Sequence, residues 1–159
     1  MSPVQVTIRP LQTDADIDAF RELNEEWIAR HFFVEEQDRI QLDDPLGAYI
    51  EPGGQILIAD VDGRPAGCVA IVPEGDEGAF ELSKMAVAPE LRGQGAGRRL
   101  LEEAIECARS LGARSLFLGS STKLSSAVHL YETAGFVHVP AESLHMPYDR
   151  ADVFMELAL

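Results

Sequence analysis

The chain has 159 residues, of which 46% are hydrophobic and 25% charged, and its formal net charge at pH 7 is −14. This length and composition suit one globular domain over residues 1–159, and no apolar run is long enough to span a membrane. Such a negative surface repels nucleic acid and anionic membranes, so neither is expected as a partner. Because the N-terminus shows no charged and then apolar leader, we expect a cytoplasmic protein.

The first half of the chain predicts a strand, a helix and a strand meander. Apolar alternation in VQVTIRP predicts an opening strand that ends at Pro10, and Thr13 is a good N-cap for a helix reaching about Arg30. The following HFFVEEQDRIQLDDP reads either as a loop or as a short helix ending at Pro45. Asp62-Gly63 is a strong hairpin turn signal. The meander strands are QILIADV, GCVAIV and AFELSKMAV.

The second half predicts a strand–helix–strand unit. Apolar residues recur at helical spacing over residues 97–111, with Gly112 as a plausible C-terminal cap. SLFLGS follows as a short strand, and this arrangement implies parallel pairing with a right-handed crossover. The remaining elements are a helix in SSAVHLYETAG and late strands in FVHV and ADVFMEL. The expected fold class is therefore α/β (α+β), with a mixed central sheet flanked by helices.

Two cysteines, Cys68 and Cys107, fall within an expected strand and an expected helix. They form neither a CxxC motif nor a paired spacing. We therefore expect buried thiols, not a disulfide, a metal site or a nucleophile.

A glycine-rich basic turn, LRGQGAGRRL, joins the third meander strand to the next helix. A dinucleotide-binding G-x-G-x-x-G frame fails there, because Leu100 or Arg98 stands where the third glycine is needed. A Walker A loop fails because no Gly-Lys-Ser/Thr follows. What remains is Arg92, Gly95 and Gly97 in an R-x-x-G-x-G frame.

Small residues in this turn let a ligand approach the backbone, and the helix that follows presents free N–H groups and the positive end of its dipole. The turn therefore suits a multiply charged phosphate group such as a pyrophosphate. A tight strand-to-helix connection with no ligand is the alternative.

With these residues in place, the chain resembles the GNAT superfamily of N-acetyltransferases over nearly its whole length. The superfamily signature Q/R-x-x-G-x-G/A follows a strand, and Arg92, Gly95 and Gly97 match it. HLYETAGF resembles the second family motif, L-Y-x-x-x-G-F. The resemblance implies acetyl-CoA as donor and no metal. Homodimers are common among relatives, so a homodimer is possible here.

In that fold the coenzyme pyrophosphate sits on the glycine turn, and the pantetheine arm pairs with the backbone of the central strand. Many relatives carry an asparagine where this chain has Leu124, so its contact would be absent or replaced by Ser121, Thr122 or Ser125. The residues implied in coenzyme binding are Met85, Ala86, Val87, Arg92, Gly93, Gln94, Gly95, Ala96, Gly97, Arg98, Ser121 and Ser125.

Acyl transfer from a thioester to an amine needs a base for the amine, an acid for the thiolate and a stabilised oxyanion. Tyr131 matches the motif tyrosine and is the expected acid, because a phenol is protonated at pH 7. Glu81 is the expected base, and an exposed glutamate facing solvent is the alternative. Backbone N–H groups near Ala86 or Val87 would stabilise the oxyanion.

In this fold the first helix and the loop after it usually wall the acceptor pocket. Acidic residues of HFFVEEQD would hold a cationic amine there, or Arg150 would favour a carboxylate, as in an amino-acid-like acceptor. The expected substrate-binding residues are Phe32, Phe33, Glu35, Glu36, Tyr148 and Arg150.

The expected activity is transfer of acetyl from acetyl-CoA to a primary amine of a small molecule or a protein, without a covalent enzyme intermediate. A non-catalytic acyl-CoA-binding or regulatory module of the same fold is the alternative. Transfer of a longer acyl group, or transfer to a hydroxyl, also stays open.

Overall fold

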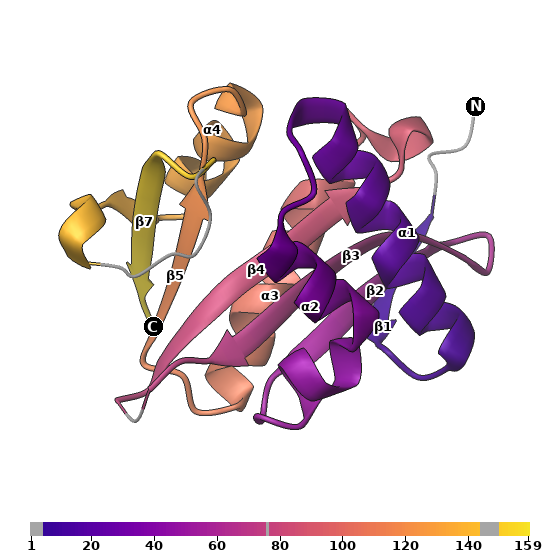
Figure 1. Cartoon of the computed structure of the whole chain (residues 1–159), viewed down its shortest axis with the longest axis horizontal. Helices are drawn as coiled ribbons and strands as arrows, with labels where there is room; N and C mark the ends of the chain where they lie inside the picture. Colours follow the sequence, from indigo (N-terminus) through magenta and orange to yellow (C-terminus); the bar gives the residue numbers. More distant parts are fainter. Residues whose placement is uncertain (1–4, 76, 144–149) are drawn as a thin grey trace.

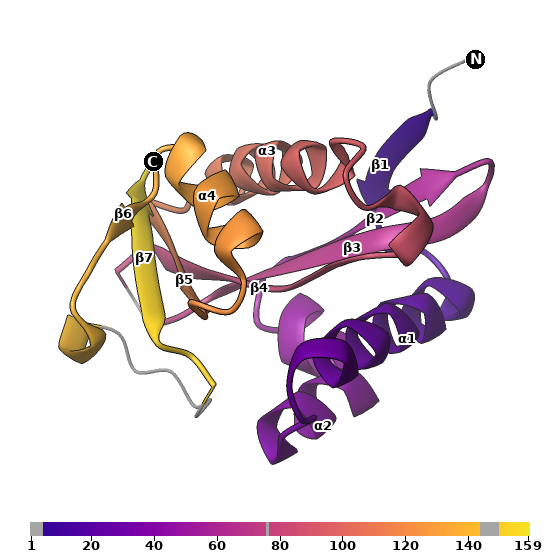
Figure 2. The same ribbon diagram turned by 90° about the horizontal axis from the view of Figure 1, so that it is seen from above.

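The computed structural model describes residues 5–75, 77–143 and 150–159. Seven strands form one mixed sheet in the order β1-β2-β3-β4-β5-β7-β6, in which β4 and β5 pair in parallel. The helices α1 and α2 cover one face of the sheet, and α3 and α4 cover the other (Figure 2). This is the expected mixed α/β fold. In chain order the elements are β1 (Val6–Pro10), α1 (Asp14–His31), α2 (Glu36–Asp43), η1 (Leu46–Ile50), β2 (Gln55–Val61), β3 (Arg64–Pro73), β4 (Ala79–Val87), η2 (Pro89–Leu91), α3 (Ala96–Ser110), β5 (Ser115–Ser120), α4 (Ser125–Thr133), β6 (Val137–His138), η3 (Ala141–Ser143) and β7 (Val153–Ala158).

Several local signals act as expected. Thr13 caps α1, and its hydroxyl accepts a hydrogen bond from the amide of Asp16 at 3.2 Å. Asp62 and Gly63 both have positive φ, 51° and 76°, the backbone of a two-residue hairpin turn between β2 and β3. The ambiguous segment after α1 contains a helix, α2, whose N-terminus carries a capping box of Glu35 and Asp38.

The late strands are shorter than the sequence predicts. FVHV contributes only Val137–His138, because β6 lies at the sheet edge and pairs with β7 over two positions. Both residues are exposed, so little burial favours a longer strand there. Cys68 is buried, as expected, whereas Cys107 is half-buried.

Two cores lie on the two faces of the sheet. Leu100 and Leu101 of α3 belong to one, packed over β2–β5, and Phe20 and Ile28 of α1 belong to the other. The α3 helix thereby has a fixed position over the sheet, which also fixes the glycine turn at its start. Within the described residues, no helix is both long and apolar enough to cross a membrane.

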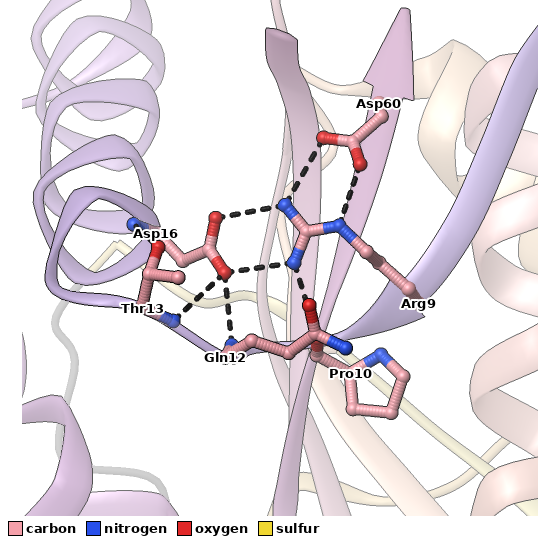
Figure 3. Close-up of polar contacts among 6 residues, drawn as sticks. All are labelled: Arg9, Pro10, Gln12, Thr13, Asp16 and Asp60. Carbon is pink, nitrogen blue, oxygen red and sulfur yellow. Dashed lines mark hydrogen bonds and ion pairs between the residues drawn. The ribbon is translucent and has the colours of Figure 1, made fainter. Parts of the chain in front are cut away.

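A three-charge cluster anchors α1 to the edge of the sheet (Figure 3). The guanidinium of Arg9 donates to both carboxylate oxygens of Asp16, at 2.7 and 2.8 Å, and also to Asp60. The same Asp16 carboxylate accepts from the amides of Gln12 and Thr13 at 2.8 and 3.1 Å. These hydrogen bonds, above all those from Arg9, hold the pKa of Asp16 far below its ordinary value. The entry of α1 is therefore tied to β1 and β2.

Candidate active site

A cleft opens where β4 and β5 separate. These parallel strands pair only at Ala79–Ser115, Phe80–Leu116 and Glu81–Phe117 within the described residues. Beyond Glu81 the two strands diverge, and β5 and β7 turn away from β4 (Figure 1). The cleft has a volume of about 620 Å³, and its walls come from α1, β4, the glycine turn, β5, α4 and the segment before β7. The second half of β4 thus presents an unpaired edge to the cleft.

An irregularity in β4 shapes this edge. The register between β3 and β4 shifts between Cys68 and Ala70, so that two residues, Lys84 and Met85, face one residue on β3. Lys84 has a positive φ of 56°, which is uncommon for a non-glycine residue. Such a bulge redirects side chains and leaves backbone groups outside the ladder. Met85, Ala86 and Val87, expected to contact the coenzyme, all line the cleft beside it.

The glycine turn borders the same cleft. Gly93, Gly95, Ala96 and Gly97 line it, while Gln94 and Arg98 are exposed and lie outside the lining. Gln94 folds back onto the carbonyl of Glu90 at 2.7 Å, and Arg98 pairs along the helix with Glu102. The structure therefore turns these two side chains away from the space expected for the phosphates.

The backbone of the turn is prepared for an anion. Gly95 caps α3 with a φ of 81°, and within the part of the chain that the structure describes no protein acceptor bonds the amides of Gly95, Ala96, Gly97 and Arg98. Gly97 lies inside the helix, and a Cβ added to it would meet only Leu130, at 3.8 Å. Neither helical backbone nor packing requires glycine at this position, where it costs helix stability. A glycine here leaves space for a ligand to approach the backbone closely.

Arg92 is held by three contacts next to this turn. Its Nε donates to the carbonyl of Val87 at 3.1 Å, its Nη2 donates to Glu26 at 2.7 Å, and its guanidinium lies 5.0 Å from the ring centre of Trp27. Its Nη1 is buried and has no hydrogen-bond partner among the residues that the structure describes. A buried guanidinium nitrogen without a partner is costly, so this atom is suited to an added acceptor such as a phosphate oxygen.

Glu81 lies in the wall of the cleft at the point where β4 and β5 part. Glu81 is only 8% exposed, so the alternative of a strand glutamate that faces solvent is wrong. Burial raises the pKa of Glu81 to about 7, with help from the charge of Glu74 and against that of Lys84. A carboxyl group with this pKa can exchange protons near neutral pH.

Tyr131 lies in the same cleft, on α4. It is 8% exposed and packs near Phe136, with ring centres 5.9 Å apart. Burial raises the pKa of Tyr131 to about 12, so the phenol keeps its proton at neutral pH. The structure therefore brings Glu81 and Tyr131, far apart in the sequence, into the wall of one cleft.

The loop between β5 and α4 supplies further polar groups. Ser121 and Ser125 both line the cleft, and the Ser121 hydroxyl accepts from the amide of Lys123 at 3.2 Å. Thr122 is instead bound to Asp152, through its amide at 2.8 Å and its hydroxyl at 3.0 Å. Ser121 and Ser125 are thus the candidates that stand in place of the family asparagine, and Leu124 lies between them in the lining.

The two neighbouring phenylalanines after α1 have different positions. Phe32 lines the cleft, but Phe33 is 89% exposed and lies outside it. Consecutive residues in extended backbone point in opposite directions, so one aromatic side chain reaches the cleft and the other does not. Glu36 is exposed and also lies outside the lining. Tyr148 falls outside the described residues.

The remaining acidic residues of this segment are paired with cations. Asp38, which is fully buried, binds Lys84 at 2.9 Å and receives two hydrogen bonds from Arg150, at 2.7 and 2.8 Å. Arg150 also contacts Glu35 at 3.0 Å. Burial opposes ionisation of Asp38, but Arg150 and Lys84 outweigh it and hold its pKa at about 2. Lys84 was not anticipated from the sequence, where the one signal is a lysine within the mostly apolar strand AFELSKMAV.

The comparisons with known proteins show which family the chain belongs to. Residues 17–136 match the model of the Acetyltransferase (GNAT) family. An uncharacterised N-acetyltransferase of Schizosaccharomyces pombe is 33% identical over 141 residues, covering 86% of this chain and 85% of that protein. A GNAT-family acetyltransferase structure from Staphylococcus aureus has a TM-score of 0.87 at 19% identity, covering 97% of this chain and 99% of that one. A GNAT-family acetyltransferase from Brucella melitensis, solved in complex with acetyl-CoA, has a TM-score of 0.70 at 23% identity, covering 97% and 88% of the two chains. The chain therefore belongs to the GNAT family of acetyltransferases.

Proposed function

We propose that this protein transfers an acetyl group from acetyl-CoA to a primary amine. The observation that carries the proposal is one cleft bordered by both the unbonded amides of the glycine turn and the unpaired edge of β4. The first suits a diphosphate and the second suits the amide groups of a pantetheine arm. The complex of the Brucella relative with acetyl-CoA supports the same donor.

The donor would lie along the cleft from α3 to β4. The amides of Gly95, Ala96 and Gly97 and the Nη1 of Arg92 would bind the diphosphate oxygens. The arm would add to the β4 edge near Met85, Ala86 and Val87, with Ser121 and Ser125 close to it. This path would aim the thioester at the region between Glu81 and Tyr131.

The chemistry needs no covalent enzyme intermediate. The amine nitrogen attacks the thioester carbonyl, its proton passes to Glu81 directly or through water, and the C–S bond breaks. The leaving thiolate takes a proton from Tyr131, and a backbone N–H near Ala86 or Val87 stabilises the oxyanion in between. Because its pKa is raised to about 7, Glu81 exchanges between the carboxyl and carboxylate forms near neutral pH.

Binding and turnover test this proposal separately. Acetyl-CoA at a hundredfold excess over its Kd should stabilise the fold by about 3 kcal/mol, seen as a clear rise in Tm. A panel of amines with acetyl-CoA should then release free thiol, and mass spectrometry of the product should find an added acetyl group. A rise in Tm without thiol release from any acceptor would favour a non-catalytic acyl-CoA-binding module, and a longer acyl group or an ester product would correct the reaction.

A further inference from the structure

The charged side chains that line the cleft are mostly basic, although the protein as a whole is acidic. The chain carries 27 acidic and 13 basic residues. Among the described residues that line the cleft, Glu81 is the single acid, against five basic side chains: Arg30, Lys84, Arg92, Lys123 and Arg150. Arg92 lies at the glycine turn, where the donor phosphates would bind. The other basic residues need a separate explanation.

Two of these cations lie close to one aromatic ring of the cleft lining. The Nζ of Lys123 lies 5.4 Å from the ring centre of Phe32, and the Cζ of Arg150 lies 5.9 Å from it. The three residues come from separate segments, after α1, before α4 and before β7. These segments therefore converge into one cationic and aromatic wall, which we call the Phe32 wall (Phe32, Lys123 and Arg150).

The described ion pairs near this wall involve Arg150 but not Lys123. Two acids, Glu35 and Asp38, are paired with two cations, Lys84 and Arg150. Lys123, by contrast, forms no ion pair with any described carboxylate and is exposed at the cleft. Glu35 and Asp38 are thus already paired with cations and do not offer a site to a cationic group, and Asp152, the nearby acid, accepts from the amide and hydroxyl of Thr122. Lys123 keeps its ammonium group available to an added carboxylate.

We infer that the acceptor is an amine that also carries a carboxylate, as an amino acid does, and that its carboxylate binds at the Phe32 wall beside Lys123. This inference rests on the proposed function. The carboxylate would pair with the ammonium group of Lys123, while the amine is directed toward Glu81, the acid in the cleft lining. A polyamine or a lysine-rich peptide would instead bring more positive charge to a wall that is already cationic.

The test compares acceptors that differ only in the carboxylate. Each amino acid of a panel is assayed beside its carboxamide and its decarboxylated amine, by thiol release at fixed acetyl-CoA. We expect kcat/KM to be at least tenfold higher for the best free amino acid than for its carboxamide or its decarboxylated amine. Lys123→Glu should remove this preference and should leave the KM for acetyl-CoA within twofold. Arg64→Glu, an exposed charge reversal outside the cleft lining, is the matched control and should preserve the preference.

The outcomes separate this inference from the proposed function. Thiol release with decarboxylated amines but not with the free acids would overturn the inference and leave the acetyltransferase intact. A Lys123→Glu variant that loses acetyl-CoA affinity and keeps its acceptor preference would assign Lys123 to the donor and also overturn it. Acetyl-CoA binding with no thiol release from any amine would overturn both. Lys123→Gln, which removes the charge without reversing it, should give an intermediate loss and guards against a folding defect.

Discussion

Lys84 and Asp38 form a buried ion pair that joins the bulge of β4 to the first turn of α2. Their Nζ and Oδ1 atoms are 2.9 Å apart, and the two side chains are 3% and 0% exposed. Asp38 also binds Arg150 and accepts the amide of Glu35 at 2.9 Å. One carboxylate of α2 therefore ties two walls of the cleft together: the bulge of β4 and the segment before β7.

Replacing Asp38 by Asn should strongly destabilise the protein. The variant leaves the Lys84 ammonium buried without its counter-charge, which typically costs about 3–5 kcal/mol of the free energy of unfolding. Urea denaturation measures this directly. Arg39→Ala is the control: it breaks an exposed ion pair with Glu25 and should cost less than about 1 kcal/mol. Equal, small losses in the two variants would contradict a structural role for the buried pair.

The Asp38 carboxylate should make the stability of the fold depend on pH in the acidic range. The pKa of Asp38 is lowered from 3.8 to about 2 in the folded protein, so its charged form favours folding. That contribution, roughly 2 kcal/mol, is complete above the unfolded pKa and is lost as the pH falls through the folded pKa. Stability should therefore drop between about pH 4 and pH 2.

Asp38→Asn should flatten this part of the pH–stability curve, as measured by chemical denaturation at each pH. Asp16, whose pKa is also lowered, by its hydrogen bonds to Arg9, will keep part of the slope in the variant. A curve with the same slope in wild type and variant would place the acid sensitivity elsewhere.

The rate should rise with pH through the ionisation of Glu81. Because the carboxylate is the working form and its pKa is about 7, kcat/KM should increase toward a plateau above neutral pH. Glu81→Gln should remove this rise of kcat/KM with pH, which is the acidic limb of the pH–rate profile, and should lower the rate by about 100-fold or more. The variant should unfold less easily above pH 7, since burial of the charged carboxyl opposes folding there. Lost activity with unchanged or greater stability separates a catalytic role from a structural one.

A neighbouring acid offers a finer test of Glu81. The charge of Glu74 raises the pKa of Glu81, and Glu74 itself is exposed and does not line the cleft. Glu74→Gln should therefore move the acidic limb of the pH–rate profile to lower pH and leave the plateau rate unchanged. Glu77→Gln, an exposed acid in the same turn, serves as the control and should leave the limb in place. If the acidic limb stays at the same pH in Glu74→Gln, the titration belongs to a group other than Glu81.

Much of the scaffold could be read from the sequence because its signals are local. The Asp62-Gly63 turn, the Thr13 cap and the strand–turn–helix order around Gly95 each depend on neighbours in the chain. The motif tyrosine, Tyr131, could be placed for the same reason.

The acceptor side could not be read in this way. Asp38 and Arg150 stand 112 positions apart, so their pairing depends on the tertiary fold. The bulge at Lys84 depends on how β3 and β4 pair, and strand periodicity alone would not place a lysine inward. The different exposures of Phe32 and Phe33 depend on the exit angle of α1, which hydrophobicity does not specify.

Removing the phenol of Tyr131 should slow the release of the thiol. Tyr131→Phe keeps the ring and its contact with Phe136, so the fold should keep its Tm within a few degrees. Loss of the proton donor should lower kcat by about 100-fold, with little change in the affinity for acetyl-CoA. Single-turnover kinetics of thiol release check this. An established turnover that survives the substitution unchanged would assign the acid to another group or to water.

The glycine at position 97 allows the donor site to be tested apart from the chemistry. The helix can carry a Cβ here, because that atom would meet only Leu130, at 3.8 Å, and Leu has a better helix propensity than Gly by nearly 1 kcal/mol. Gly97→Leu should therefore leave the ligand-free protein as stable as the wild type or more so. Its side chain would occupy the space next to the unbonded amides, so the Tm shift caused by acetyl-CoA should largely disappear.

The matched control is Ser110→Leu, an exposed substitution at the other end of α3 that should keep the full shift. Calorimetric titration with CoA and with desulfo-CoA, which share the diphosphate, should report the same loss for Gly97→Leu. A diphosphate bound at the glycine turn would clash with the added Leu side chain. If the variant still binds both ligands with wild-type affinity, the diphosphate therefore does not lie on the glycine turn.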